Sequence, residues 1–96
     1  MSFKLKIKES AQKEWEKLDN TIRNQFKKKL SEVLLNPHVP KNALSSMPNC
    51  YKIKLRSAGY RLVYLVRDNE LVVLIVAVGK RDKEAVYKNA AHRLKK

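Results

Sequence analysis

The feature that most constrains the fold is an apolar run of eight residues, Leu71–Val78, that contains no polar side chain. Its β-branched composition is typical of a strand, and a strand that is apolar on both faces must be covered on both. Eight residues are far fewer than the about 20 that a helix needs to cross a bilayer. The run therefore predicts the central strand of a sheet in a soluble protein, without a membrane-spanning segment.

Two segments before this run predict its partner strands. Over residues 51–56, apolar and cationic residues alternate, so one face of the strand is apolar and the other wholly cationic: Tyr51, Ile53 and Leu55 against Lys52, Lys54 and Arg56. Residues 60–67 form the next strand after a turn at 57–59, and Asp68-Asn69 turn the chain into a third strand over 70–78. We predict an antiparallel meander.

The length of the first turn decides which face carries Arg61. With a two-residue loop, Ala58-Gly59, Arg61 faces Arg56 and shares the face of the strand lysines. A three-residue loop would bury its guanidinium with no acid nearby in sequence, which is costly. We therefore predict the even loop.

The N-terminal third predicts a strand and two helices. Residues 3–8 alternate apolar side chains with lysines, which is typical of a half-buried strand. Apolar residues then recur at helical spacing over 10–18, with Ser10 as the expected N-cap, and again over 22–34, where Asn36-Pro37 ends the second helix. We expect these helices to form a hairpin on one face of the sheet.

The C-terminal part predicts a loop at 37–49, which holds all three prolines, and a last helix capped by Asp82. The apolar stripe of this helix is narrow and alanine-rich, so we expect weak docking: Val86, Tyr87, Ala90, Ala91 and Leu94. The apolar floor of the cationic face needs a cover, which this helix, a ligand or a partner protein would provide.

The predicted architecture is a small α+β domain over residues 1–96. It has an antiparallel β-sheet, an N-terminal helical hairpin packed on one face and a short C-terminal helix.

The net charge indicates a polyanionic partner. The 96 residues hold 22 Lys+Arg against 9 Asp+Glu, a formal charge of +13, and no acid lies between Glu32 and Asp68. Cations that meet phosphates release condensed counterions, so such a stretch favours binding to nucleic acid. The alternative is a solvated basic surface, which is also the simpler interpretation of Lys27, Lys28 and Lys29 in the second helix.

Composition excludes several classes of function. The two glycines form no phosphate-binding loop, and no Cys/His cluster has metal-ligand spacing, so we expect neither cofactor nor metal. A lone Cys50 forms no internal disulfide, and the N-terminus lacks a secretory signal, which favours the cytoplasm. His38 and His92 lie away from the cationic strand, so a catalytic histidine pair is not expected.

The cationic face could bind RNA or cleave it, and spacing alone leaves both open. Crowding by other cations lowers the pKa of a lysine, so one of Lys52 and Lys54 could act as base and the other as acid. Arginine stays charged, so Arg61 and Arg81 could only position and stabilise a phosphorane. We expect Arg81 to lie at the sheet edge next to Tyr87.

Several of these segments together resemble a known family. The run from Met47 to Tyr64, MPNCYKIKLRSAGYRLVY, and the later pieces Val78-Gly79-Lys80-Arg81 and Val86-Tyr87 strongly resemble the RelE toxins of bacterial type II toxin–antitoxin systems. The Trp15 helix and the lysine-rich second helix extend the resemblance over nearly the whole chain, and imply the RelE/ParE-like fold.

The resemblance implies a ribosome-dependent endoribonuclease that cleaves mRNA in the A site of the 70S ribosome by attack of a 2′-hydroxyl on the adjacent phosphate. Such a toxin inhibits translation as part of a stress response. A cognate RelB-like antitoxin neutralises it, and it reaches operator DNA only through the antitoxin complex.

The resemblance also assigns residues. Lys52 and Lys54 match the acid/base lysines, Arg61 and Arg81 the phosphate-stabilising arginines, and Tyr87 the aromatic that stacks on or orients the scissile nucleotide. Residues expected to bind RNA, including ribosomal RNA, are Lys27, Lys28, Lys29, Arg56 and Lys80.

The chain departs from related patterns in two places. It lacks the Glu/His pairing of toxins such as YoeB, and it has Ser45-Ser46 where close relatives carry a basic residue, which affects one RNA contact. The alternatives are a ParE-like toxin that poisons DNA gyrase and a non-enzymatic RNA-binding protein. The presence of all five site residues argues against the gyrase poison.

Overall fold

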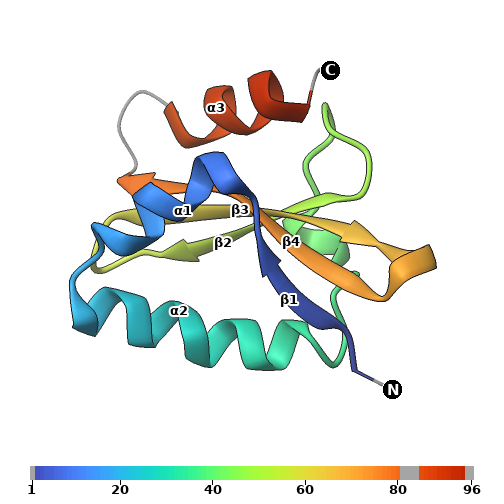
Figure 1. The fold of residues 1–96 in the computed structure, drawn as a ribbon, viewed down its shortest axis with the longest axis horizontal. Coiled ribbons are helices and arrows are strands. Elements are labelled where there is room, and N and C mark those ends of the chain that lie inside the picture. Colours follow the sequence, from blue (N-terminus) through green and yellow to red (C-terminus); the bar gives the residue numbers. More distant parts are fainter. Residues whose placement is uncertain (1, 81–84, 95–96) are drawn as a thin grey trace.

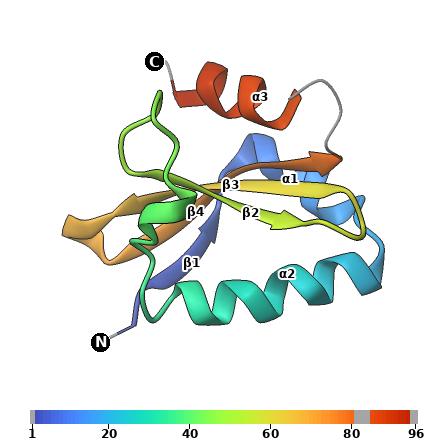
Figure 2. The same ribbon diagram turned by 180° about the vertical axis from the view of Figure 1, so that it is seen from behind.

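The computed structural model describes residues 2–80 and 85–94 as an α+β domain (Figures 1 and 2). Its elements follow in chain order: β1 (Lys4–Ile7), α1 (Glu9–Glu16), α2 (Asn20–Val33), the 3₁₀ turn η1 (Pro40–Asn42), β2 (Cys50–Leu55), β3 (Tyr60–Arg67), the 3₁₀ turn η2 (Asp68–Glu70), β4 (Val72–Lys80) and α3 (Ala85–Leu94). No helix among these described residues is both long and apolar enough to cross a membrane.

The four strands of the sheet lie in the order β1-β4-β3-β2. Strands β2, β3 and β4 form the predicted antiparallel meander, and the apolar β4 has a strand on each side, as expected. The prediction of an antiparallel sheet is wrong for β1, which pairs parallel to β4 with Lys4 opposite Val72. Parallel neighbours need a long crossover connection, and here α1, α2 and the β2–β3 hairpin together supply it.

The β2–β3 hairpin has the predicted parity but not the predicted loop. Leu55 pairs with Tyr60 and Lys54 with Arg61, so the loop has four residues, 56–59, instead of two. Gly59 closes it with a left-handed φ of 72° and an N–H that donates to the Leu55 carbonyl at 2.8 Å. An even loop still leaves Arg61 on the face of Lys52 and Lys54, whereas Arg56 moves into the loop.

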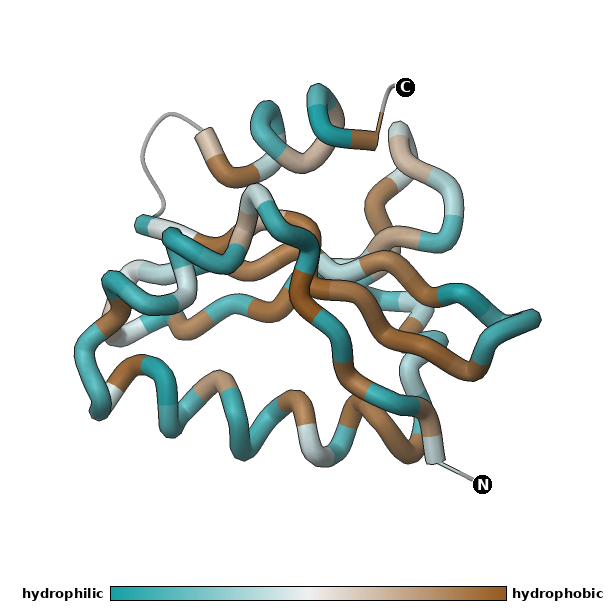
Figure 3. The backbone as a smooth tube through the Cα atoms, viewed as in Figure 1, coloured by the Kyte–Doolittle hydropathy of each residue, from teal (hydrophilic) through white to brown (hydrophobic). Residues whose placement is uncertain are grey.

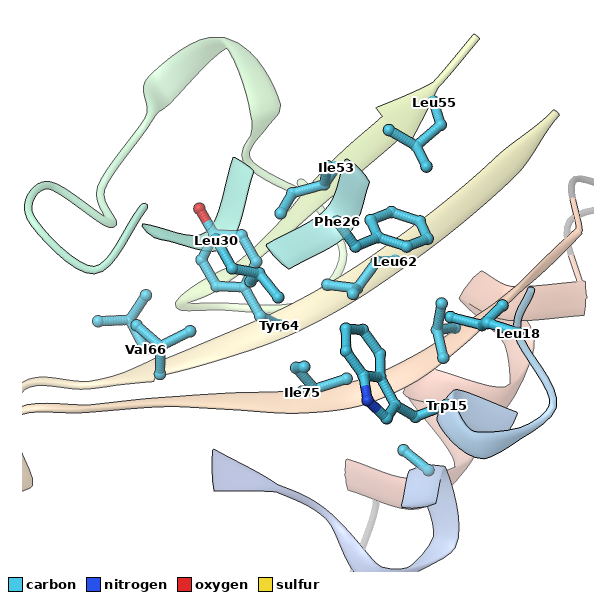
Figure 4. Close-up of a cluster of buried hydrophobic side chains, with 13 residues drawn as sticks. Trp15, Leu18, Phe26, Leu30, Ile53, Leu55, Leu62, Tyr64, Val66 and Ile75 are labelled. Atoms are coloured by element: carbon cyan, nitrogen blue, oxygen red, sulfur yellow. The ribbon is translucent and has the colours of Figure 1, made fainter. Parts of the chain in front are cut away.

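The predicted helical hairpin covers one face of the sheet. Figure 4 shows Trp15 of α1 and Phe26 of α2 directed at the strands, with ring centroids 6.4 Å apart. The cluster they belong to consists of Ala11, Trp15, Leu18, Phe26 and Leu30 against Ile53, Leu55, Leu62, Tyr64, Val66, Val73, Ile75 and Val78. Along the chain, hydropathy alternates over α2 and is almost uniformly apolar over β4 (Figure 3).

The opposite face of the sheet is covered by α3 (Figure 1), one of the three covers considered from the sequence. A second apolar cluster lies between them: Met47, Cys50, Val63, Val76, Ala77, Val86 and Ala90. The predicted stripe is wrong at Ala91, which is exposed, and Tyr87 is only partly buried. Burial raises the pKa of the Cys50 thiol to about 11, so this cysteine acts as an apolar core residue.

The starts of α1 and β4 differ from the predicted ones. The N-cap position of α1 is Lys8, not Ser10, because the helix already begins at Glu9, whose carboxylate suits the positive end of the helix dipole. β4 begins at Val72 instead of residue 70, because the 3₁₀ turn η2 takes Asp68–Glu70. The expected cap Asp82 lies outside the described residues.

Replacing Phe26 with alanine tests the first cluster. Phe26 is fully buried, so we expect Phe26→Ala to lower the free energy of unfolding by about 3–5 kcal/mol. Gln25, an exposed neighbour in α2, provides the control: Gln25→Ala should change the free energy of unfolding by less than about 0.5 kcal/mol. Chemical denaturation of both variants measures this, and a loss below about 1 kcal/mol for Phe26→Ala would contradict the packing described.

Candidate active site

A cleft of about 560 Å³ opens between the cationic face of the β2–β3 hairpin and the start of α3. We call it the cationic cleft, and its lining residues are Leu44, Ser45, Ser46, Met47, Lys52, Lys54, Arg61, Lys80, Val86 and Tyr87. It brings together four of the five residues predicted to be catalytic. The fifth, Arg81, lies outside the described residues and follows Lys80 in the sequence.

The register of the strands positions the cations. Lys54 lies directly opposite Arg61, and Lys52 lies opposite Val63, so all three side chains share the face that α3 covers. On its other side, Arg61 pairs with Gly79 of β4. A Cβ at Gly79 would lie 3.4 Å from a methyl carbon of Val86, at ordinary van der Waals distance, so α3 packs directly over this end of β4.

The cations in the cleft are crowded. The neighbouring charge of Lys52 is the largest cause that lowers the pKa of Lys54, followed by burial and by the charges of Arg61 and Arg56. None of the described residues that line the cleft is acidic, so none of them offsets this repulsion. The surrounding charges therefore favour the neutral form of the Lys54 amine.

The loop before β2 forms a wall of the cleft, of which the sequence connects only Ser45-Ser46 with RNA. It supplies the apolar side chains of Leu44 and Met47 and the hydroxyls of Ser45 and Ser46. Two backbone hydrogen bonds fasten it to the start of β2: Leu44 N–H to the Cys50 carbonyl at 3.0 Å, and Cys50 N–H to the Met47 carbonyl at 3.2 Å. Its position in the sequence, next to the cationic strand, indicated that it could lie near the site. Its conformation could not be predicted, because a loop has no periodic pattern of side chains.

The residues predicted to bind RNA do not lie together. Lys80 lines the cationic cleft. Lys29 and Arg56 line a second hollow of about 660 Å³ between α2 and the outer edge of β2, which we call the edge groove. Lys41, not predicted as a site residue, also lines it, and so do Lys52 and Lys54. Lys27 and Lys28 are exposed on α2 and line neither hollow.

The histidines lie outside both hollows. The Nε2 atom of His38 is 3.0 Å from a carboxylate oxygen of Asp68, and its ring packs edge-on against Phe3 and Tyr51. His92 is exposed on α3. Within residues 2–80 and 85–94, no group of three His, Cys, Asp or Glu side chains is arranged to hold a metal ion.

The sequence and the fold match those of small bacterial toxins. Residues 5–85 match a family model described as ParE toxin of type II toxin-antitoxin system, parDE. The chain is 53% identical over 94 residues to the mRNA interferase toxin RelE of Escherichia coli K12, which covers 98% of this chain and 99% of that protein.

Solved structures show the same similarity. An arginine-to-alanine double mutant of E. coli toxin RelE in the free state has a TM-score of 0.91 at 52% identity, covering 98% of this chain and 99% of that one. A chain of the intact E. coli RelBE toxin–antitoxin complex has a TM-score of 0.81 at 54% identity, covering 86% and 100%. The chain belongs to the ParE-type toxin family of type II toxin–antitoxin systems and, within it, to the RelE toxins, which confirms the resemblance.

The charge crowding in the cleft can be tested by titration. Lys52→Met removes the neighbouring charge that lowers the pKa of Lys54 most, so this pKa should rise toward the ordinary value of about 10.4. NMR detection of the lysine Cε signals against pH measures it. Lys28→Met removes an equal charge from the exposed face of α2, outside the cleft, and should leave the pKa of Lys54 unchanged. An unchanged Lys54 pKa in Lys52→Met would show that the two ammonium groups do not interact.

Proposed function

We propose that this chain is a ribosome-dependent mRNA interferase, an endoribonuclease that cleaves mRNA in the A site of the 70S ribosome and thereby inhibits translation. The observation that carries the proposal is the convergence of Lys52, Lys54, Arg61 and Tyr87 in one cleft whose described lining has no acid. The E. coli relative, 53% identical, is named an mRNA interferase toxin.

In the proposed reaction, Lys54 is the general base. Its lowered pKa leaves a fraction of the amine free to take the proton from a ribose 2′-hydroxyl. The 2′-oxygen then forms a bond to the adjacent phosphorus while the bond from phosphorus to the 5′-oxygen breaks. Lys52, as the ammonium, donates a proton to the departing oxygen. The products are a 2′,3′-cyclic phosphate and a free 5′-hydroxyl.

The arginines act by charge alone. Arg61, which lies opposite Lys54 in the hairpin, stabilises the negative phosphorane. Arg81, the residue that follows Lys80, has the same role. Tyr87, in the first turn of α3, lines the same cleft as the strand lysines. Its ring can therefore stack on the scissile nucleotide and orient it.

The ribosome supplies what this acid/base set lacks. Two lysines without a histidine or glutamate make a weak pair on free RNA, and orientation of mRNA in the A site compensates by proximity. Lys29, Lys41 and Arg56 in the edge groove, with Lys27 and Lys28 on α2, provide the cations that dock on ribosomal RNA. Action on ribosomes places the protein in the cytoplasm.

The partner that silences the chain is a cognate RelB-like antitoxin, since an E. coli relative was solved as a RelBE toxin–antitoxin complex. An acidic antitoxin segment could cover the cationic cleft or displace α3, and operator DNA would be reached only through that complex. A gyrase poison is disfavoured because it does not cleave RNA and so does not need a cleft that combines Lys52 and Lys54 with Arg61.

The charge-only role predicts the effect of removing one arginine. Arg61→Ala and Arg81→Ala should each lower single-turnover cleavage on programmed ribosomes by roughly 10²–10³-fold, as expected for the loss of a fixed donor to the transition state. Arg67→Ala removes an equal charge from an exposed ion pair with Glu70 and should have little effect. Activity within a few-fold of wild type for both site variants would exclude their assignment.

The proton-transfer role predicts a different result for the lysines. Lys54→Arg keeps the charge but cannot give up a proton, so ribosome binding should persist while the rate falls by roughly 10²–10⁴-fold. In the wild type, the rate should rise with pH as Lys54 loses its proton, with an apparent pKa below about 10.4, and this dependence should vanish in the variant. Lys17→Arg is the control. Full activity of Lys54→Arg would place the base elsewhere.

A further inference from the structure

An ion pair joins the far end of α3 to α1. The guanidinium of Arg93 donates to both carboxylate oxygens of Glu14, from NH1 at 2.9 Å and from NH2 at 3.0 Å. The side chains are only 18% and 28% exposed. A two-bond contact of this kind, partly shielded from water, is stronger and more directional than a surface ion pair.

The same two side chains also bond to the edge of β4. The NH1 group of Arg93 donates to the Val76 carbonyl at 2.8 Å, and the Val78 N–H donates to the Glu14 carboxylate at 3.3 Å. β1 pairs with β4 only as far as Ile75, so it does not reach this stretch of the edge. The ion pair therefore supplies the donor and the acceptor that a neighbouring strand would otherwise provide.

A bulge in β4 makes this contact possible. In the β3–β4 ladder, Ile75 pairs with Tyr64 and Ala77 with Val63, which leaves Val76 as an extra residue without a partner. A bulge redirects the local backbone. Here the carbonyl of the extra residue is the one that accepts from Arg93.

The apolar contact of α3 with the sheet is made by few buried side chains. Val86 and Ala90 are its buried residues, while Tyr87 and Leu94 are partly exposed. Tyr87 and Arg93 lie six residues apart, about 9 Å along a helix. One end of α3 thus carries the aromatic of the cationic cleft, and the other end carries the anchor.

We propose that Glu14 and Arg93 are positioning residues: they latch α3 to the bulged edge of β4 and so hold Tyr87 in the cationic cleft. The effect on cleavage rests on the proposed function, whereas the hold on α3 does not. The latch needs a carboxylate at position 14 and a guanidinium at position 93 in that orientation, since each also bonds to a backbone group of fixed polarity.

The test begins with Arg93→Gln in the full chain. Without RNA, amide hydrogen exchange of α3 should rise about tenfold or more, the size expected from losing hydrogen bonds between charged groups. The ring signals of Tyr87 should shift in NMR spectra, while exchange in the centre of β4 stays unchanged. Arg67→Gln, which removes an equal charge from the exposed pair with Glu70, should change none of these. Unchanged exchange of α3 in Arg93→Gln would overturn the latch.

A double variant that exchanges the two charged residues distinguishes a latch that needs the strand edge from a simple ion pair. In Glu14→Arg with Arg93→Glu, attraction between the charges is kept, but a guanidinium would face the Val78 N–H and a carboxylate the Val76 carbonyl. We expect α3 to stay as loose as in Arg93→Gln. Full recovery of its protection would show that charge alone holds the helix, and would refute the role of the strand edge.

Cleavage on programmed ribosomes gives the last measurement. Arg93→Gln should lower kcat about tenfold with less than a twofold change in KM, because Tyr87 is misplaced while the docking cations remain. An unchanged kcat with a loosened α3 would show that the latch does not position Tyr87 for the reaction. Absence of cleavage by the wild type would refute the proposed function, while the exchange data would still decide whether the latch exists.

Discussion

The structure depends on the burial of β4 on both faces. Because this strand is apolar on both faces from residue 72 to residue 78, it needs one cover from α1 and α2 and another from α3. The second cover must share its face with the cations of β2 and β3. The cationic cleft forms where these two requirements meet, since α3 covers the apolar part of the face and leaves Lys52, Lys54 and Arg61 at its margin.

Much of this arrangement could be predicted from the sequence, because side-chain alternation is a local property. Alternation identified the cationic face, and the cost of burying a guanidinium placed Arg61 on it. The loop length could not be predicted, because only its parity affects which face Arg61 occupies and both two and four are even. The direction of β1 was also out of reach, since pairing between distant segments leaves no periodic signal.

The Glu14–Arg93 contact was missed for a related reason. Its members lie 79 residues apart in the chain, and in sequence each looks like an ordinary surface charge. The bulge at Val76, which presents the carbonyl that Arg93 uses, depends on the register of β3 and β4. Such a contact becomes visible only when the strands are aligned in space.

These features make α3 both a cover of the core and a part of the site. Its buried residues against the sheet are Val86 and Ala90, and Arg93 bonds its far end to Glu14 and to the edge of β4. A partner that competes for the face under α3 would therefore need to break few interactions. Removal of the helix would take Tyr87 out of the cleft while Lys52 and Lys54 stayed in place. One helix thus has two roles: it closes the second face of β4 through Val86 and Ala90, and it brings Tyr87 to the cationic cleft.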